Sequence, residues 1–455
     1  MIWALSKTRA NREPANKLMF KTLPGFREFY PEDCAKKSAM FEVWKNTART
    51  FGFSEFEPPV LESLDLFMEK SGEEIRSQLF EFTDKGGREV ALRPEMTPSL
   101  ARMVGARAGG IRRPVKWFAI GENYRYERQQ KGRLRAFYQF NADILGDESI
   151  SADAEIIALL IESLRSFGLT ENEFKLRLGD RNLWVLFLET LGIGDDRIAS
   201  VLSVVDKIEK VRPEAFSEMM AEALTGSGLS AGEVSENCRK FVAINSVENL
   251  EAAFSSCNEE FKAKIEARLN DWRNLLSILD LMGVGGFVKV DMGIVRGLAY
   301  YTGFVFEAFQ TVGTGRALAG GGRYDALVKK LGYPDMCAVG FGMGDVTVGD
   351  LLELTDKLPK ADFSPDAYAV IGSQELVSRV LPIVFELRRS GVKVDYPFKI
   401  SGFGKQFKMA DAVGAKFALI FGEDELSKNS VKIKDLKLGT ETEVEISKLL
   451  SFFGK

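Results

Sequence analysis

The most informative absence from this 455-residue chain is histidine, which does not occur at all. Histidine titrates near neutral pH, and it is the usual general base and the commonest metal ligand in proteins. Its absence excludes nucleophile pairs of serine or cysteine with histidine, and it excludes histidine-based metal centres. Any chemistry must therefore use carboxylates, arginine, lysine, tyrosine or a metal ion with oxygen ligands.

Cysteine is scarce, and the few cysteines are scattered along the chain. There are four, and no two of them form a CxxC motif: Cys34, Cys238, Cys257 and Cys337. This spacing excludes a disulfide framework and a cysteine-based zinc site. It predicts a protein of a reducing compartment, and we expect a cytoplasmic one.

Long apolar runs are also missing. No window approaches the length of an apolar segment that crosses a bilayer, so we expect no membrane partner. The first residues, MIWALSKTRANREPANKL, are polar to basic and lack the apolar centre of a secretory signal. We expect residues 1–19 to be a disordered tail. The alternative is that the start codon was assigned too far upstream and that translation begins at Met19.

The composition otherwise suits a globular protein with more than one core. The chain is 45% hydrophobic and 11% aromatic, which is ample for core formation. Its length predicts two or three domains. Because the net charge is −4, any binding of nucleic acid must depend on local basic patches.

The spacing of apolar residues divides the chain into segments of different structure. Helix and strand patterns mix in residues 20–182 and return in 284–350, whereas residues 183–283 are almost wholly helical in pattern. Residues 351–364 are typical of a linker, and strands alternate with helices in 365–455. We predict an α+β core with a helical insertion, followed by a small α/β domain with a mixed or parallel sheet.

The most unusual stretch is GENYRYERQQKGRLRAFYQFNADILG at residues 121–146, which predicts a hairpin with a long polar tip. Alternation along its second strand puts apolar side chains on one face and polar ones on the other. The apolar set is Tyr138, Phe140, Ala142 and Ile144, and the polar set is Gln139, Asn141 and Asp143.

On the first strand of the hairpin, Asn123, Arg125 and Glu127 share a face. If the polar faces of both strands point the same way, they form an open floor for a small zwitterion beside a phosphate. Arginine binds anions with a fixed fork, and a carboxylate accepts hydrogen bonds from nitrogen. The alternative is an exposed hairpin with a solvated polar face.

The tip of the hairpin, RYERQQKGRLR, is rich in basic and amide side chains. Arg128 and Arg133 supply positive charge, and Gln130 can hydrogen-bond to a base edge. Such a loop could cradle polyphosphate or an RNA backbone. The alternative is a charged tip that keeps the hairpin soluble.

Two further segments carry candidate ligand-binding residues. RPEMT at residues 93–97 places Glu95 and Thr97 on a turn that enters a helix, with Thr97 as the expected N-cap. A helix N-terminus attracts carboxylates and phosphates, although the same letters also form an ordinary capped helix. VRGLAYYTG at residues 295–303 places Arg296 before a strand that carries Tyr300 and Tyr301.

The glycine-rich stretch GGGRYD at residues 320–325 is not a Walker loop, because no GK[ST] follows it. Its glycines favour close approach of the backbone to a ligand. The alternative is a glycine-rich turn between packed strands.

Taken in order, RPEMT, NYRYERQQKGRLRAFYQF, VRGLAYYTG, GGGRYD and the final α/β segment resemble the histidyl-tRNA synthetases, a class II aminoacyl-tRNA synthetase family. The resemblance spans roughly residues 20–450. It implies an antiparallel class II catalytic sheet with a helical insertion, a C-terminal anticodon-binding domain and a homodimer. It also implies an enzyme that forms histidyl-adenylate from L-histidine and ATP, with Mg²⁺, and transfers the histidyl group to tRNA(His).

The same resemblance implies roles for individual residues. Arg125, at the position of the motif 2 arginine, and Arg296 would be catalytic and would contact the carboxylate and the α-phosphate. The residues that would bind histidine are Glu95, Thr97, Gln139, Asp143, Tyr300, Tyr301 and Tyr324. Arg128, Gln130 and Arg133 would face ATP and the acceptor end of the tRNA.

Two departures from the family pattern stand out. Asp143 is one methylene shorter than the carboxylate that is usual in the family. In AVGFGMGDVTVGDLL, Val346 and Thr347 occupy the places of the third-motif glutamate and arginine, and that arginine normally binds the γ-phosphate of ATP. Arg323 and Arg316 are the candidates to replace it.

Two other functions fit parts of this sequence. A synthetase-like regulatory subunit of ATP phosphoribosyltransferase would explain the missing third-motif arginine, but that subunit typically lacks the C-terminal domain. An RNA-binding module on the same fold would bind tRNA without activating an amino acid. Histidine-dependent exchange of pyrophosphate into ATP separates the enzyme from both alternatives.

Overall fold

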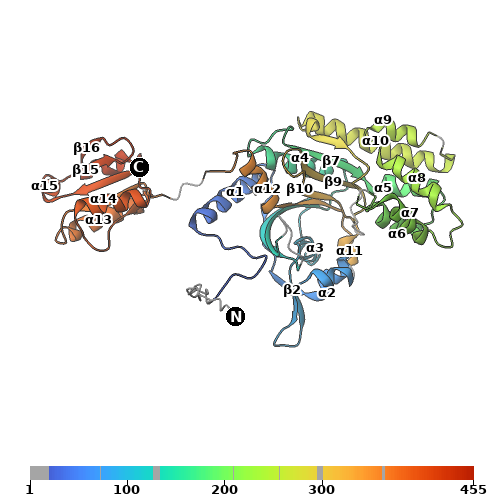
Figure 1. Cartoon of the computed structure of the whole chain (residues 1–455), viewed down its shortest axis with the longest axis horizontal. Coiled ribbons are helices and arrows are strands. Elements are labelled where there is room, and N and C mark those ends of the chain that lie inside the picture. Colours follow the sequence, from blue (N-terminus) through green and yellow to red (C-terminus); the bar gives the residue numbers. More distant parts are fainter. Residues whose placement is uncertain are drawn as a thin grey trace, which may run out of the picture. The chain divides into compact units, whose positions relative to one another are not determined.

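The computed structural model describes residues 20–71, 73–126, 134–208, 210–255, 257–294, 301–360 and 364–455. The chain divides into two compact units, Met1–Pro359 and Lys360–Lys455, which are described separately (Figure 1). The expected tail, residues 1–19, lies outside the described residues. Within the described part, no helix has the length and apolarity that a membrane span requires.

The first unit is built on an eight-stranded sheet with the order β1-β5-β6-β11-β10-β9-β7-β8. The six central strands pair antiparallel, which confirms the predicted class II type of sheet. The two edge strands pair parallel to their neighbours, which the sequence analysis did not predict. The strands are β1 (Ser54–Glu55), β5 (Val115–Tyr124), β6 (Ala136–Leu145), β7 (Phe174–Asp180), β8 (Val288–Val290), β9 (Phe304–Gln310), β10 (Ala317–Arg323) and β11 (Ala338–Gly344).

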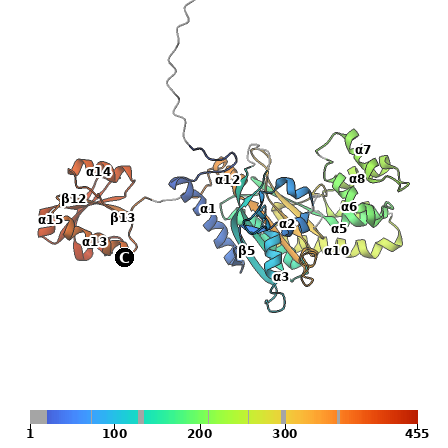
Figure 2. The same cartoon turned by 90° about the horizontal axis from the view of Figure 1, so that it is seen from below.

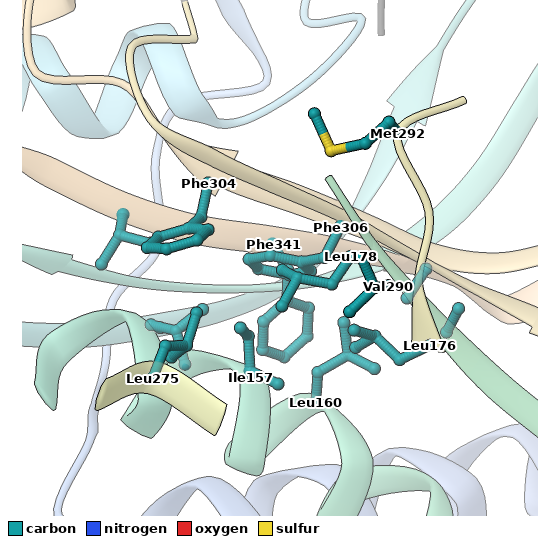
Figure 3. Close-up of a cluster of buried hydrophobic side chains, with 14 of the residues drawn as sticks. Ile157, Leu160, Leu176, Leu178, Leu275, Val290, Met292, Phe304, Phe306 and Phe341 are labelled. Carbon is teal, nitrogen blue, oxygen red and sulfur yellow. The ribbon is translucent and has the colours of Figure 1, made fainter. Parts of the chain in front are cut away.

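One face of this sheet is covered by helices and forms the main core. The covering helices are α1 (Pro31–Thr50), α4 (Ile150–Arg165) and α10 (Glu259–Leu281). Ile157 and Leu160 of α4 and Leu275 of α10 meet buried side chains of the strands, among them Phe306 and Phe341 (Figure 3). Burial of this apolar surface is the main term that stabilises the sheet.

Smaller elements complete the first unit around this sheet. A three-stranded sheet of β2 (Leu61–Ser63), β3 (Glu81–Thr83) and β4 (Glu89–Leu92) lies with α2 (Leu64–Ser71), η1 (Glu73–Gln78) and α3 (Thr97–Gly105). Later in the chain come η2 (Gly285–Phe287), α11 (Leu327–Lys330) and α12 (Asp345–Leu354). The predicted linker, residues 351–364, therefore begins inside α12.

The predicted helical insertion, residues 183–283, contains no strand among its described residues. Its helices are α5 (Arg181–Thr190), α6 (Asp195–Val205), α7 (Pro213–Ala223), α8 (Ala231–Val242), α9 (Val247–Ala253) and α10. They gather at one end of the first unit (Figure 2). Asp180, which has no exposed surface, caps α5 and accepts hydrogen bonds from Arg268 and Trp272 of α10 at 2.7 and 2.8 Å. This buried aspartate therefore fixes the insertion to the end of β7.

The second unit is a five-stranded mixed sheet with the order β13-β12-β14-β15-β16. β12 pairs parallel with β13 and β14, and the other pairs are antiparallel, as the alternation of strand and helix predicted. The strands are β12 (Ala367–Ile371), β13 (Val394–Asp395), β14 (Phe417–Phe421), β15 (Ser430–Asp435) and β16 (Glu441–Glu445). The helices are α13 (Val377–Arg389), α14 (Phe403–Ala412), α15 (Glu423–Ser427), η3 (Ile446–Lys448) and α16 (Leu449–Phe452).

Candidate active site

The other face of the eight-stranded sheet, on which α3 and α11 pack, carries the polar side chains of β6. Phe140, Ala142 and Ile144 belong to the buried core, whereas Gln139, Asn141 and Asp143 point the other way, as the alternation predicted. Paired residues of neighbouring antiparallel strands share a face. Asn141 is therefore flanked by Ala119 of β5 and Gly342 of β11, and Asp143 is flanked by Trp117 and Gly340.

Glycines on β11 make room for these polar side chains. A Cβ on Gly340 would lie 1.9 Å from Oδ1 of Asp143, and a Cβ on Gly342 would lie 2.5 Å from Nε2 of Gln139. A Cβ on Gly340 would also lie 2.8 Å from the backbone oxygen of Ala142, so this position must lack a side chain, whereas a Cβ on Gly342 would displace the Gln139 amide. At these two positions of β11 the floor of the site is backbone without side chains, and the side chains of β6 extend over it.

A carboxylate and two tyrosines meet at one end of this floor. The hydroxyl of Tyr324 donates to Oδ1 of Asp143 at 2.6 Å, and both residues are buried. Tyr301 packs against the glycine-rich strand β10. A Cβ on Gly322 of this strand would lie 3.1 Å from the ring of Tyr301. The structure therefore brings together three of the residues that the sequence nominated for histidine binding.

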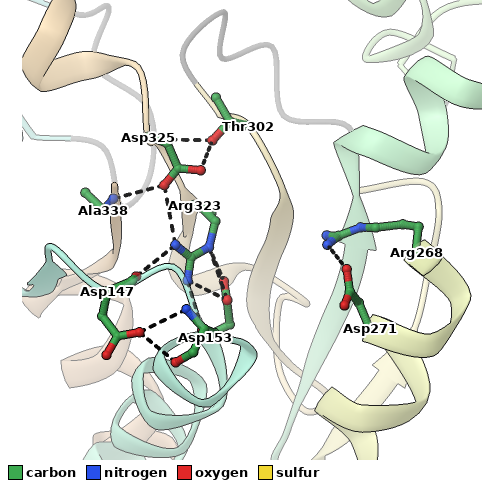
Figure 4. Close-up of polar contacts among 9 residues, drawn as sticks. Asp147, Asp153, Arg268, Asp271, Thr302, Arg323, Asp325 and Ala338 are labelled. Carbon is green, nitrogen blue, oxygen red and sulfur yellow. Dashed lines mark hydrogen bonds and ion pairs between the residues drawn. The ribbon is translucent and has the colours of Figure 1, made fainter. Parts of the chain in front are cut away.

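A polar network fixes the backbone segments that carry the two tyrosines. Thr302, next to Tyr301, hydrogen-bonds to Asp325, next to Tyr324, at 3.0 Å (Figure 4). Arg323 donates to Asp153 of α4 at 2.6 Å and lies on the core side of the sheet, 7% exposed. Burial disfavours a charged guanidinium, but the hydrogen bonds and charge of Asp153 outweigh it and raise the pKa of Arg323. Arg323 therefore points away from the candidate site and is committed to the fold.

The other end of the floor holds an arginine and two amides. Arg125 follows the last residue of β5, and its Nε donates to the carbonyl of Pro94 at 3.0 Å. Its guanidinium lies 5.4 Å from the ring centre of Phe137. Asn123, which has no exposed surface, donates from Nδ2 to Oε1 of Gln139 at 3.1 Å. Arg125 and Gln139 are thus both fixed near the segment RPEMT.

RPEMT itself is held by a buried arginine that the sequence analysis missed. Arg93 is 3% exposed and donates to the carbonyl oxygens of Glu122 and Pro58 at 2.9 and 2.7 Å. Burial lowers the pKa of this guanidinium. Glu95 is half-buried, and Thr97 is the buried first residue of α3. The predicted N-cap was wrong by one position: Met96 occupies it, without a capping side-chain bond, because the helix begins at Thr97.

A tyrosine beside this region has a raised pKa. Tyr124 ends β5, and its hydroxyl donates to Oε2 of Glu122 at 2.9 Å. Burial, together with this hydrogen bond and the charge of Glu122, raises the pKa of Tyr124 to about 12.

The third-motif region lies where β11 runs into α12. Thr347 is in the first turn of α12, and its Oγ1 is 3.7 Å from the position that a Cβ on Gly344 would take. Asp345, 4% exposed, accepts from Arg27 at 2.7 Å and from the backbone of Tyr138 at 2.9 Å. Burial raises the pKa of Asp345 despite these favourable contacts. Arg316 precedes β10 and forms a 3.9 Å ion pair with Asp350 of α12.

Several nominated residues lie outside the described residues, and the structure gives no position for them. They are Arg128, Gln130 and Arg133 of the hairpin tip and Arg296 and Tyr300 of the segment before β9.

Two residues of the polar face, Asn141 and Phe137, were not nominated as site residues. The alternation along β6 already placed Asn141 between Gln139 and Asp143, so this signal was available. Phe137 required the structure, because only there does its ring lie beside Arg125.

Comparisons with known proteins identify the family to which the chain belongs. The sequence model of the family described as histidyl-tRNA synthetase matches residues 25–345, and that of the anticodon binding domain matches residues 366–455. The histidine–tRNA ligase of Opitutus terrae is 53% identical over 93% of this chain and 96% of its own.

Solved structures give the same result for the fold. The histidyl-tRNA synthetase of Nostoc sp. superposes with a TM-score of 0.78 at 23% identity, covering 96% of this chain and 99% of its own. The apo histidyl-tRNA synthetase of S. aureus gives a TM-score of 0.72 at 25% identity, covering 96% and 100%. The predicted family and fold are confirmed, and the ligase is favoured over the regulatory subunit. This chain belongs to the histidyl-tRNA synthetase family.

Proposed function

We propose that the chain activates L-histidine with ATP and transfers it to tRNA(His) on the polar face of the eight-stranded sheet. The observation that carries this proposal is the buried pair of Asp143 and Tyr324 at 2.6 Å, at one end of a glycine floor whose other end holds Arg125 and Gln139. A floor of this kind accepts a small zwitterion lengthwise, with its ring toward Asp143 and its backbone groups toward Arg125.

The imidazole ring is recognised at the end of the floor that holds Asp143 and Tyr324. Asp143 accepts from a ring N–H, and Tyr324 orients the carboxylate by donating to its other side. Tyr301 and Tyr300 enclose the ring. A site that hydrogen-bonds a substrate N–H rejects analogues lacking it by about 10⁴ to 10⁵. Apolar amino acids of similar size would bury the Asp143 carboxylate without offering it an N–H.

The backbone groups of histidine lie at the arginine end. Glu95, Thr97 and Gln139 bind the ammonium group, and Arg125 and Arg296 bind the carboxylate and the α-phosphate. The histidine carboxylate attacks the α-phosphorus, and pyrophosphate leaves. This step requires alignment and neutralisation of charge rather than a general base, so a chain without histidine can perform it. The ring of Phe137 offers a stacking surface for adenine beside Arg125.

Arg316 binds the γ-phosphate of ATP in place of the missing third-motif arginine. Its ion pair with Asp350, one turn after Thr347 on α12, supports this role. The pairing of Ala319 with Met343 also brings the start of β10 beside the start of α12. Arg323 is unsuitable, because Asp153 holds it on the opposite face.

Mg²⁺ accompanies ATP and shares the charge of the pyrophosphate. This ion usually keeps several waters and needs only one or two protein carboxylates besides phosphate oxygens. The described residues contain no cluster of three or more metal-ligating side chains. They do place Glu307, which pairs with Gly320, on the same face of the sheet, and this carboxylate would hold the ion.

The remaining parts serve the tRNA and the assembly. Arg128, Gln130 and Arg133 of the hairpin tip contact ATP and the acceptor end, and the unit from Lys360 binds the anticodon. The protein works as a cytoplasmic homodimer. Exposed apolar side chains before and at the start of α1 support an association surface: Phe20 is 83% exposed, Leu23 67% and Tyr30 65%.

Histidine-dependent exchange of pyrophosphate into ATP tests the main proposal, together with charging of tRNA(His). The wild type should exchange and charge. Asp143→Asn should lower kcat/KM for histidine by at least about 100-fold, because the ring loses a buried charged partner. Asp335→Asn is the matched control, since Asp335 is exposed and pairs with the exposed Lys329.

Each alternative function predicts a different result in that experiment. Histidine binding without exchange would identify a regulatory subunit. Binding of tRNA with neither exchange nor histidine binding would identify an RNA-binding module.

Arg316→Ala tests the assignment of the γ-phosphate separately. KM for ATP should rise about 10-fold while KM for histidine stays unchanged, because only ATP loses a charged contact. Arg389→Ala, an exposed arginine of the second unit, serves as the control. An unchanged KM for ATP in the Arg316 variant would show that another group replaces the missing arginine.

A further inference from the structure

Asn141 is an unusual residue for the floor of this site. It is 4% exposed and lies between Gln139 and Asp143 on the polar face of β6. Its cross-strand neighbours are Ala119 and Gly342, neither of which has a polar side chain. The cross-strand neighbours therefore offer the amide no side-chain hydrogen bond.

The side chain of Asn141 shows the consequence of this placement. Its Oδ1 is buried and has no hydrogen-bond partner among the described residues. Its Nδ2 leans over the glycine floor, 3.4 Å from the position that a Cβ on Gly342 would take. An unsatisfied buried polar group costs a protein stability, and such groups occur where a function requires them. A purely structural role does not explain a buried amide whose oxygen has no hydrogen-bond partner in the described part of the chain.

We propose that Asn141 is a specificity determinant for histidine, whose side-chain amide donates to the ring nitrogen that Asp143 does not bind. This inference rests on the proposed function, because it takes the ring to lie beside Asp143. Residues two apart on a strand are about 7 Å apart on the same face. Asn141 therefore lies one such step from Asp143 toward the end that binds the backbone of histidine, where the nearer ring nitrogen falls.

The protonation pattern of a neutral imidazole fits this pair of contacts. One ring nitrogen carries a hydrogen and the other accepts. Asp143 takes the N–H, so the second nitrogen needs a donor, and Nδ2 of Asn141 supplies it. Together the two residues hydrogen-bond to both ring nitrogens, which distinguishes imidazole from rings that have only one nitrogen.

The test compares binding of histidine with binding of pyrrol-3-ylalanine, which keeps the far N–H and has carbon at the nearer position. Binding is measured directly by calorimetry on the full-length protein, so it does not depend on catalysis. The wild type should bind histidine about 10- to 100-fold more tightly than the pyrrole. Asn141→Ala should bind both ligands alike, at the affinity of the wild type for the pyrrole.

Two further variants separate this role from a structural one. Asn141→Asp keeps the shape but presents only acceptors, so it should lose the preference for histidine as the alanine variant does. Asn249→Ala removes an amide from the exposed surface of α9 and should change neither affinity. The melting temperature of Asn141→Ala without ligand should equal or exceed that of the wild type, since the variant removes an unsatisfied group.

The outcomes are distinct from those that test the proposed function. Equal weakening of both ligands in Asn141→Ala, or a lowered melting temperature with the preference intact, would overturn the role of Asn141. Full preference for histidine in Asn141→Asp would overturn the donor assignment. Histidine binding that follows the prediction without any pyrophosphate exchange would support the role of Asn141 and refute the ligase.

Discussion

The two faces of β6, the strand at the centre of the candidate site, differ in chemistry between residues 139 and 143. On β6, Phe140 has no exposed surface and packs on Trp44 and Phe341, with ring centres 5.6 and 5.4 Å away. The residues on either side of it, Gln139 and Asn141, face the glycine floor. A strand repeats every two residues, so adjacent positions serve stability and function separately. Substitutions one residue apart should therefore separate the two properties, and the following predictions test that.

The largest effect on stability should come from the core face. Phe140→Ala should lower the free energy of unfolding by about 3–5 kcal/mol, through lost burial and the cavity left behind. Urea unfolding followed by tryptophan fluorescence measures this, because all five tryptophans precede residue 360 and report on the first unit. Phe82→Ala is the control: Phe82 is 51% exposed, and its removal should cost far less. Equal losses in the two variants would contradict the assignment of the core.

The largest effect on activity should come from the floor opposite. Gly340→Ala should weaken histidine binding about 100-fold, because the new Cβ would lie 1.9 Å from Oδ1 of Asp143 and displace the carboxylate. Calorimetric titration with histidine measures the loss. Unfolding should change less than in Phe140→Ala.

Gly349→Ala is the matched control for that substitution. Gly349 lies in α12, and nothing lies within 4 Å of the position that its Cβ would take. Binding should not change, and stability should rise by about 0.5–1 kcal/mol, since alanine favours a helix over glycine. Binding that survives in Gly340→Ala would show that the histidine site lies elsewhere.

A smaller effect should come from a residue that connects the floor to the helical insertion. Arg181 follows the buried Asp180 and donates from Nη1 to the backbone carbonyl of Tyr301 at 2.6 Å. Arg181→Ala should raise KM for histidine about 10-fold with little change in kcat, because it loosens a residue that encloses the ring. Arg181→Lys should recover part of the loss. A fall in kcat with KM unchanged would place the residue in the chemical step instead.

The smallest effect is expected on how the stability of the fold depends on pH. Tyr124 has a pKa of about 12 in the folded protein, against an ordinary value of 10.0. Between these values the unfolded chain has lost the proton and the folded chain has kept it, so stability falls as the pH rises from 10 toward 12. Tyr124→Phe should make that fall less steep. Phenolate absorbance of the folded wild type should show one tyrosine more titrating near pH 12 than the variant does; identical titrations would refute the shift.

Sequence reasoning succeeded where a local repeat determines the result. The alternation along residues 138–144 correctly assigned each side chain of β6 to its face, and the helical periodicity of the insertion matched the helices that form there. The order of short motifs identified the family. Each of these signals lies within a few neighbouring residues, so no knowledge of distant contacts was necessary.

The sequence reasoning fell short where distant segments meet. The glycines of GGGRYD were expected to let the backbone approach a ligand, but nothing local showed that those of β11 make room for Asp143 and Gln139. Arg323 looked available from its sequence position, but its strand register turns it toward Asp153. The parallel edge strands β1 and β8 are two and three residues long, which is too short for a pattern.

The sequence by itself determined the chemistry that this protein can use, the periodicity of its elements and the family to which it belongs. Only the tertiary structure decided which side chains share the site: Tyr324 reaches Asp143 across 181 positions of sequence, and Arg125 reaches Pro94 across 31. It also decided that the cross-strand neighbours of Asn141 are Ala119 and Gly342, which offer its amide no side-chain hydrogen bond. The physical reason is that hydrogen bonding and burial depend on distance in space, which strand pairing sets, whereas a sequence pattern reports only the direction of each side chain from its own strand or helix.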